Sequence, residues 1–349
     1  MKTLTMIFIL LGLTPAMSQT SFKVMSYNVE NMLDTIDNPS KMDEEFTPEG
    51  SRHWTAGRYW KKMRHIAKVI TSVGGWEAPA IVALCEVEND SVIRDLTSRT
   101  PLRQDDYRYV ITNGPDIRGI NVALLYQRDK FRLIGHESLP ITFSNGRKRA
   151  TRDILHVYGE IITHDTLDIF ICHFPSRYGG EKESEANRID AANRLKIAGD
   201  SISASRGNPL ILIMGDFNDS PYDSSMSQAL GAKTISSIQP QSMIMDNIYY
   251  NLIPKMDREI NGSHKYQGEW SQLDQIIVNG RLLNQSYPIH IATGSTHIFS
   301  PGFILTDDKR WLGSRPFRTF HGYKYEGGFS DHLPIVTEIL IGNKVASKH

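Results

Sequence analysis

Polar residues suited to acid–base and metal chemistry follow directly after an apolar run in the segment LILIMGDFNDSP, residues 210–221. Five apolar residues lead to Gly215, and Asp216, Asn218 and Asp219 come immediately afterwards. A short apolar run of this kind is typical of a buried strand. Since Asp, Asn and Pro are also common turn residues, the segment alone fits either an oxygen-rich site or a simple turn.

The same arrangement, with polar groups at one end of an apolar run, recurs in five other segments. They are KVMSYNVEN with Asn28 and Glu30, IVALCEVEN with Glu86, DIFICHFPSR with His173 and Arg177, SQLDQIIV with Asp274, and GGFSDHLPIV with Asp331 and His332. Each residue alone has an ordinary explanation as a solvated strand edge, a packed histidine or a turn former. Together they indicate a shared site at the strand ends.

The combined set has the chemistry of a metal-dependent phosphate site. Hard oxygen ligands of the kind that Mg²⁺ prefers are offered by Asn28, Glu30, Glu86 and Asp331. The two histidines are suited to proton transfer, the other aspartates to orienting them or activating water, and arginines to binding phosphate oxygens. Zinc is disfavoured, because no His or Cys pair has a spacing such as H-x₃-H or C-x₂-C. We therefore expect metal-assisted hydrolysis of a phosphate ester, with Mg²⁺ as the ion and Mn²⁺ or Ca²⁺ as alternatives.

Short apolar runs outnumber helical patterns along the chain, which favours an α+β layered architecture over a doubly wound parallel sheet. Strands are expected within residues 22–29, 80–87, 107–114, 120–127, 154–163, 167–174, 210–217, 275–280 and 333–342. Apolar residues at helical spacing predict helices over residues 55–75 and 184–203. Residues 231–272 and 293–328 have little regular pattern and are expected to be long loops. Without a linker-like segment, residues 19–349 are expected to form a single domain.

The N-terminal residues have the pattern of a secretory signal peptide. Lys2 precedes the apolar stretch 6–13, and Ala16-Met17-Ser18 supplies a small-x-small cleavage site. We expect residues 1–18 to be removed after Ser18 and the mature chain to be periplasmic or extracellular. The apolar stretch is too short to cross a bilayer, and no other segment approaches that length, so no transmembrane segment is expected.

Composition and cysteine content limit the classes of protein to consider. The 349 residues contain 39 Lys+Arg and 39 Asp+Glu, which argues against a strongly basic nucleic-acid binder but permits local phosphate binding. Cys85 and Cys172 both lie in strand-like runs. They are interpreted as buried core residues in preference to a disulfide, although an exported protein permits pairing.

The ordered blocks SYNVEN, CEVEN, HFPSR, GDFND, QLD and SDH resemble the endonuclease/exonuclease/phosphatase superfamily over essentially the whole mature chain. That superfamily includes deoxyribonucleases, abasic-site endonucleases, inositol polyphosphate 5-phosphatases and bacterial sphingomyelinases. The stretches DIRGINVALLY and HFPSRYGG are similar to an exported bacterial branch. The resemblance implies a four-layer α/β sandwich, in which two mostly antiparallel sheets pack face to face with helices outside.

The resemblance also implies roles for the individual residues. Glu86 matches the metal-binding glutamate, with Asn28, Glu30 and Asp331 beside the ion. Many nucleases have Asp at the position of Glu30, so whether Glu30 contacts the metal directly stays open. Asp216 matches the residue that positions or deprotonates water, Asn218 a phosphate contact, His332 the catalytic histidine, Asp274 its orienting partner, and His173 the second histidine of deoxyribonuclease-like members. Arg152, Arg118 and Arg177 are the candidate phosphate-binding arginines, and Asp219 is expected to be a turn residue.

The expected function is therefore that of an exported Mg²⁺-dependent phosphoesterase, in the first place a nuclease that cleaves phosphodiester bonds by attack of water. The alternative is a phosphatase or phospholipase C-like enzyme acting on phosphoinositides, sphingomyelin or another small phosphate ester. A catalytically inactive binding module is disfavoured by the complete set of acid, base and metal groups.

Two further groups of residues leave alternatives open. The basic and aromatic residues within 59–64 and 147–149 fit either phosphate contacts or solvated faces. Phe303, Trp311 and Phe317 fit membrane contact, base stacking or packing of a long loop. The substrate is the only partner expected, and no stable protein partner is implied.

Overall fold

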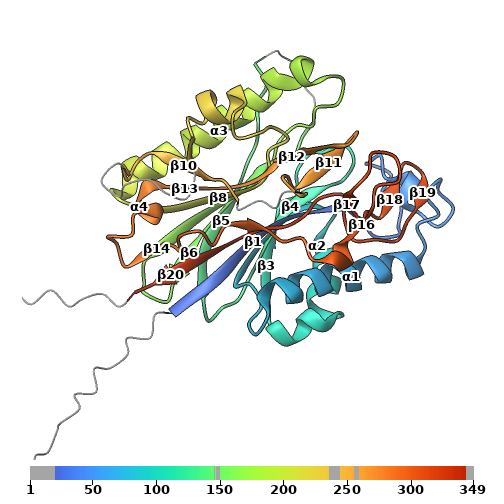
Figure 1. The fold of residues 1–349 in the computed structure, drawn as a ribbon, viewed down its shortest axis with the longest axis horizontal. Coiled ribbons are helices and arrows are strands. Elements are labelled where there is room, and N and C mark those ends of the chain that lie inside the picture. The colour runs from blue at the N-terminus through green and yellow to red at the C-terminus, as the bar shows by residue number, and fades with distance from the viewer. Residues whose placement is uncertain (1–19, 145, 147–149, 236–243, 255–258, 343–349) are drawn as a thin grey trace, which may run out of the picture.

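The apolar runs of the sequence form the strands of two seven-stranded β-sheets in the computed structural model (Figure 1). The structure describes residues 20–144, 146, 150–235, 244–254 and 259–342. The predicted signal peptide and the basic residues Arg147, Lys148 and Arg149 lie outside the described residues.

The first sheet has the spatial order β14-β20-β1-β2-β4-β3, with β15 also paired to β20. Its strands β1 and β2 are parallel, and its other pairs are antiparallel. The strands are β1 (Thr20–Met32), β2 (Ile81–Val87), β3 (Arg108–Ile111), β4 (Asn121–Tyr126), β14 (Ile289–Ile291), β15 (His297–Ile298) and β20 (Ile335–Ile341).

The second sheet has the spatial order β5-β6-β7-β8-β13-β10-β9. The pairs β7–β8 and β9–β10 are parallel and the others are antiparallel. The strands are β5 (Phe131–Leu139), β6 (Ile154–Ile161), β7 (Thr166–His173), β8 (Leu210–Asp216), β9 (Lys233–Ile235), β10 (Tyr249–Leu252) and β13 (Asp274–Asn279). Both sheets are thus mostly antiparallel, as predicted.

Helices cover the outer faces of the two sheets (Figure 1). Helices α1 (Ala56–Gly74) and α2 (Asp90–Ser98) lie on the side of the first sheet, and α3 (Glu181–Arg206) lies on the side of the second; α4 (Gly280–Leu283) is a short turn after β13. Alternate residues of β7 and β8 contribute to different hydrophobic clusters, one between the sheets and one beneath α3. The predicted four-layer α+β sandwich is confirmed.

The strand β5 and the short helices were not predicted by the sequence pattern. β5 is a mostly exposed edge strand, so it lacks the apolar run that marks the central strands. Helix α3 begins and ends three residues outside its predicted range. None of the described helices qualifies as a membrane-spanning segment.

Three small two-stranded sheets occupy the segments that were predicted to be long loops. They are β11 (His264–Tyr266) with β12 (Glu269–Ser271), β16 (Leu305–Asp307) with β17 (Ser314–Pro316), and β18 (Phe320–His321) with β19 (Lys324–Tyr325). Pairs of two or three residues are too short to produce a recognisable period in the sequence.

Both cysteines are buried and unpaired. The Sγ atom of Cys85 on β2 donates a hydrogen bond to the carbonyl oxygen of Cys172 on β7, at 3.3 Å. Their interpretation as buried core residues is confirmed, with the Cys85 side chain in the core between the sheets and that of Cys172 in the cluster beneath α3.

Candidate active site

Three neighbouring strands of the second sheet carry His173, Asp216 and Asp274 in one row. His173 ends β7 and pairs with Asp216 at the end of β8, which in turn pairs with Asp274 at the start of β13. Side chains alternate between the faces of a strand, and the residues two positions away on each strand belong to the core between the sheets. The three side chains therefore lie on the inner face of the sheet, at the edge of the core between the sheets.

Close approach of two strands explains the glycine before Asp216. Gly215 has a φ of 144°, and a β-carbon there would lie 1.9 Å from the carbonyl oxygen of Cys172 on β7. Only glycine accommodates that approach. Gly215 thus lets β8 stay paired with β7 up to the row of His173, Asp216 and Asp274, the candidate catalytic row.

The first sheet contributes Asn28 and Glu86 from the facing side. Asn28 Nδ2 donates a hydrogen bond to Asp216 Oδ2 at 3.0 Å, which links the two sheets directly. Glu86 Oε2 accepts a hydrogen bond from the backbone N–H of Asn31 at 2.8 Å, and its Oε1 lies 3.9 Å from His173 Nε2. The site is therefore divided between the two sheets.

Left-handed backbone conformations redirect the side chains at these strand ends. Glu30, Asn31, Glu86 and Asn218 have φ values of 52°, 45°, 67° and 52°. Strand pairing shifts register at the first three of these residues, and such irregularities re-aim side chains near active sites. Glu86 can thereby reach the site although its neighbour Cys85 also faces the second sheet.

His332 and Asp274 form a tight buried pair. His332 Nδ1 lies 2.6 Å from Asp274 Oδ2, and His332 Nε2 lies 3.9 Å from Asp216 Oδ2. Burial alone would lower the pKa of the ring, but the carboxylates of Asp274 and Asp216 raise the pKa of His332 well above its usual range. A charged imidazolium therefore lies beside Asp216 at neutral pH.

The pKa values of Asp216 and His173 are shifted in opposite directions. Burial, partly offset by the charge of His332, raises the pKa of Asp216 to about 6, which suits a base that works near neutral pH. Burial and the charges of Arg152 and Arg118 lower the pKa of His173 well below its usual range, so this ring is neutral. His173 Nε2 lies 3.7 Å from Asp216 Oδ2, a separation that a water molecule or a phosphate oxygen can bridge.

Asn218 is held by two hydrogen bonds, one from its backbone and one from its side chain. Its backbone N–H donates to Asp216 Oδ1 at 2.9 Å, and its Nδ2 donates to the carbonyl oxygen of Phe174 at 3.0 Å. A side-chain amide carries two N–H donors. One of them thus fixes the side chain, and the predicted phosphate contact falls to the other.

Glu30 is used mainly to hold a neighbouring loop. Its two carboxylate oxygens accept hydrogen bonds from the backbone N–H groups of Thr319, at 2.6 Å, and Phe320, at 3.1 Å. Burial and the charge of Asp331 raise its pKa. Each oxygen accepts one backbone N–H and keeps a further lone pair, so direct metal contact by Glu30 stays a prediction.

Lys62 is a buried part of the site, which neither sequence interpretation of residues 59–64 anticipated. Its ammonium donates to Thr319 Oγ1 at 2.6 Å and to the carbonyl oxygen of Phe329 at 2.5 Å. Burial lowers its pKa to about 8, against the opposing effect of Glu30, Asp331 and Glu86. Since position 62 lies three residues after Tyr59 and four before Ile66, on the apolar face of the helix, helical spacing already indicated its burial.

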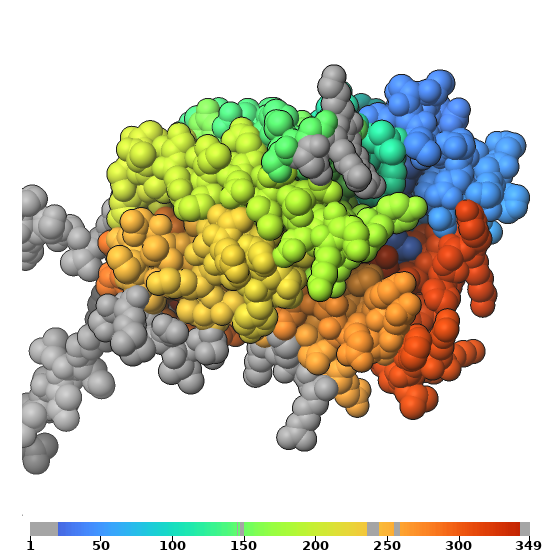
Figure 2. Space-filling view, turned by 90° about the horizontal axis from the view of Figure 1, so that it is seen from above, coloured from blue at the N-terminus to red at the C-terminus, as the bar shows by residue number. Residues whose placement is uncertain are grey.

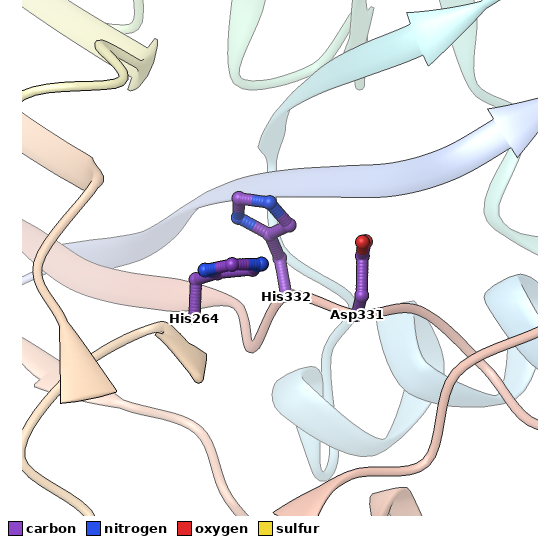
Figure 3. A group of neighbouring side chains, drawn as sticks. All are labelled: His264, Asp331 and His332. Atoms are coloured by element: carbon purple, nitrogen blue, oxygen red, sulfur yellow. The ribbon is translucent and has the colours of Figure 1, made fainter. Parts of the chain in front are cut away.

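His264 is a second site residue that the sequence analysis missed. Its ring lies 4.7 Å from that of His332, centroid to centroid, and ligand atoms of His264, Asp331 and His332 lie within 4.8 Å of one another (Figure 3). Burial and the charge of His332 lower the pKa of His264 to about 4. Burial alone would raise the pKa of Asp331, but nearby positive charge, above all that of His332, lowers its pKa below the usual range.

The three predicted phosphate-binding arginines lie at different distances from the row. Arg152 is buried and pairs with Asp116 at 3.2 Å. Arg118 is partly exposed, and its nearest guanidinium nitrogen lies 3.7 Å from Glu86 Oε1. Besides the effect of burial, the charges of both arginines act on His173 and lower its pKa, and their contact with a phosphate stays a prediction.

Arg177 is instead fully engaged by the protein. It donates to the carbonyl oxygen of Asn218 at 2.7 Å and forms ion pairs at 3.0 Å with both Glu181 and Asp223. This geometry gives it a positioning role for Asn218.

Asp219 has a larger structural role than that of a turn residue. It is buried, lies 2.7 Å from Arg188 of α3, and accepts a hydrogen bond from Ser225 at 2.7 Å. Removing one partner of such a buried pair typically costs about 3–5 kcal/mol. Asp219 therefore joins the end of β8 to α3.

The donor set fits a hard divalent cation. The charges of Glu30, Asp331 and Glu86 all act on Lys62, so one buried ammonium faces several carboxylates. Glu86 Oε1 lies 3.7 Å from Arg118 and 3.9 Å from His173, beyond hydrogen-bond distance of both. An acidic, oxygen-rich set of this kind suits Mg²⁺ or a similar ion.

Comparisons with known proteins agree with this architecture. The model of a family described as the endonuclease/exonuclease/phosphatase family matches residues 23–340. A comparison with curated proteins finds no match.

Several solved structures share the fold at low sequence identity. Truncated TDP2 from Caenorhabditis elegans has a TM-score of 0.54 and 15% identity, over 91% of this chain and 97% of that one. An endonuclease/exonuclease/phosphatase family protein from Bacteroides thetaiotaomicron has a TM-score of 0.53 and 15% identity, over 93% and 100%. The human nocturnin catalytic domain with bound sulfate has a TM-score of 0.52 and 14% identity, over 92% and 96%. At these identities the likeness concerns the fold alone.

Proposed function

Because the chain belongs to the endonuclease/exonuclease/phosphatase family, whose members are metal-dependent phosphoric ester hydrolases, we propose that it is an exported Mg²⁺-dependent nuclease. The observation that carries the proposal is the Asp274–His332 pair beside Asp216, with His173 at the other end of the same row. This arrangement provides a base, a charged ring and a neutral hydrogen-bond donor around one small space.

A divalent ion would be held by Glu86, with Asn28 and Asp331 as further oxygen donors. When bound, such an ion stabilises the negative charge that develops on the phosphoryl oxygens. Glu30 and Lys62 support this region indirectly, through the loop at Thr319 that both of them bind.

The protein's own groups have distinct tasks in the hydrolysis. Asp216, with a pKa of about 6, accepts a proton from the attacking water. As the water oxygen bonds to phosphorus, the bond from phosphorus to the leaving oxygen breaks, and that oxygen takes up a proton from solvent. The His332 imidazolium, oriented by Asp274, stabilises charge on the phosphate through Nε2. Neutral His173 donates a hydrogen bond from Nε2, and the free amide N–H of Asn218 binds a phosphoryl oxygen.

A substrate panel tests the proposed reaction. We expect hydrolysis of single-stranded or plasmid DNA or of RNA in Mg²⁺, and a loss of at least about 10²-fold in excess EDTA, because charge stabilisation by the ion is worth several kcal/mol. The panel also contains a nucleotide monoester, a phosphoinositide and sphingomyelin. Release of fluorescent or acid-soluble product and of inorganic phosphate measures the rates.

The control in this panel is the His332→Ala protein, purified in the same way, which excludes a contaminating nuclease. Hydrolysis of a lipid or a monoester without cleavage of nucleic acid would reject the nuclease and favour the phosphatase or phospholipase C-like alternative. Undiminished turnover in EDTA would reject metal dependence.

Export is a separate part of the proposal and rests on the N-terminal sequence. We expect the mature protein to begin near Gln19, because Lys2, the apolar stretch and Ala16-Met17-Ser18 form a processing signal. Mass spectrometry of the protein from fractionated cells of its native host measures this terminus. An intact Met1 on protein confined to the cytoplasm would contradict export.

A further inference from the structure

A charged cleft of about 660 Å³ lies beside the candidate active site. Its walls come from the three small two-stranded sheets that are added to the main sandwich, β11–β12, β16–β17 and β18–β19. The orange and red segments that carry them lie side by side at one end of the molecule (Figures 1 and 2). The volume is in the range of pockets that bind one small ligand.

The cleft adjoins the catalytic row through β11. His264, which stacks beside His332, is followed by Lys265, and Lys265 lines the cleft. Arg318 also lines the cleft, and its charge acts on Asp331 and on His264. The cleft and the site are therefore neighbours through adjacent residues of β11.

The cleft has more positive than negative charge available to a ligand. Four of its charged residues form two ion pairs, Lys265 with Asp308 at 3.0 Å and Arg315 with Glu326 at 2.8 Å. The charged residues that have no ion pair within the described part of the chain are four cations and one carboxylate: Lys309, Arg310, Arg318, Lys324 and Asp307. This surplus suits a ligand with phosphate groups.

Among the residues that line the cleft, Arg318 is the cation whose charge acts on Asp331 and on His264. Its Nε atom is buried and has no hydrogen-bond acceptor among the residues that the structure describes. Its Nη2 atom donates a long hydrogen bond to the carbonyl oxygen of Lys265, at 3.5 Å. A guanidinium with an unused buried N–H group is suited to binding a phosphate oxygen.

Trp311 presents an aromatic surface to the same cleft. Its side chain is 48% exposed, with the Arg310 guanidinium 5.1 Å from the ring centroid. A β-carbon at Gly268 would lie only 3.1 Å from Trp311 Cβ, so the glycine in the β11–β12 turn allows the ring to pack there. In contrast, Phe303 and Phe317 contact Phe329 and pack against the core.

We infer that this cleft binds the nucleotide unit next to the cleaved phosphodiester of a single strand, with its phosphate on Arg318, Lys309 and Arg310 and its base on Trp311. The inference rests on the proposed nuclease function and specifies its substrate. Aromatic stacking combined with a basic groove is the usual way of binding single-stranded nucleic acid. The limited volume of the cleft is the reason for choosing a single strand.

Two variants at exposed positions test the inference without touching the catalytic row. They are the double variant Lys309→Gln/Arg310→Gln and the single variant Trp311→Ala. For a single-stranded 12-nucleotide DNA in Mg²⁺, we expect KM to rise at least about fivefold in each, the lower end of the effect of one stacked base, with kcat within about twofold of wild type. For bis(4-nitrophenyl) phosphate, which carries no nucleoside on either side of the cleaved bond, the kinetics should not change.

Salt dependence and binding provide readouts beyond activity. For a single strand, each lost phosphate contact reduces the magnitude of the slope of log affinity against log salt by about 0.7. The magnitude of this slope should therefore be smaller by about 1.4 in the double variant. Fluorescence anisotropy with the labelled 12-nucleotide DNA in EDTA measures this binding without turnover. The matched controls are Arg128→Gln/Lys182→Gln and Trp76→Ala, exposed residues outside the cleft that should behave like wild type.

The outcomes separate the inference from the proposed function. If the oligonucleotide is cleaved but the cleft variants match wild type, or match the controls, the cleft assignment is wrong and the nuclease stands. If both substrates are affected equally, the cleft does not hold the neighbouring nucleotide. If wild type cleaves another phosphate ester but no nucleic acid, the nuclease proposal and this inference both fail.

Discussion

The variant His332→Ala is expected to lower kcat by about 10³-fold, the upper end of the range for losing one group that stabilises charge in the transition state. The ring lies 2.6 Å from Asp274 and 3.9 Å from Asp216, so its removal takes away the charge next to the proposed base. Alanine also leaves the Asp274 carboxylate buried without its partner. Steady-state kinetics on the substrate identified by the panel, with a melting temperature for each protein, measures the two effects separately.

The conservative variant Asp274→Asn tests whether the pair acts through charge. Activity should fall as pH drops through the pKa of Asp216, about 6, because the base must be ionised. It should also fall as pH rises through the raised pKa of His332, because the ring must be charged. Since Asp274 raises both pKa values, Asp274→Asn should move both limbs of the profile to lower pH and reduce its maximum.

His156 offers a matched control for the loss of a buried histidine. It has carboxylate neighbours at 2.9 Å on both ring nitrogens, Glu137 and Asp168, but lies within β6, outside the catalytic row. His156→Ala should reduce the melting temperature and leave kcat nearly unchanged. A His332→Ala protein with wild-type kcat, or one whose loss is matched by His156→Ala, would contradict the proposed role.

The second large effect is expected for Glu86→Gln, which keeps the side-chain shape but removes one negative charge. If Glu86 holds the divalent ion, activity should drop by at least about 10²-fold, and Mg²⁺ should no longer raise the melting temperature. An ion that binds only the folded state stabilises it in proportion to the logarithm of its concentration. A Mg²⁺ titration followed by differential scanning fluorimetry measures this without turnover.

Glu88→Gln is the control for this substitution. Glu88 is buried two residues further on, and its Oε2 accepts a hydrogen bond from the backbone of Asp34 at 2.6 Å. It should retain both the activity and the thermal response to Mg²⁺. Full turnover and a normal Mg²⁺ response in Glu86→Gln would show that the ion is held elsewhere.

The sequence predicted the main strands and the polar residues at their ends for the same physical reason. Central strands are long apolar runs, and the polar residue that ends each run lies at the sheet edge in register with its neighbours, as His173, Asp216 and Asp274 do. β5 could not be found in this way, since an exposed edge strand has no apolar run.

The missing parts of the site depend on contacts between distant segments. His264 meets His332 only because β11 folds back over the end of the chain, and no local spacing indicates that. The hydrogen bonds that Glu30 accepts likewise depend on where residues 319 and 320 are placed. Lys62 differs from these, because its place on the apolar helix face was visible in the sequence.

The left-handed strand ends have a consequence for the evolution of thermostability. Each non-glycine residue in this conformation costs about 1–2 kcal/mol, with Asn bearing less of the cost than Glu, and four of them surround the site. Their combined cost is a substantial fraction of the total stability of a typical domain, about 5–15 kcal/mol. Glycine at position 86 or 218 would relax the chain there while deleting an active-site group. At these strand ends, a substitution that increases stability also removes a group needed for turnover. Substitutions that raise the melting temperature without loss of activity are therefore expected in the distant core and on the surface.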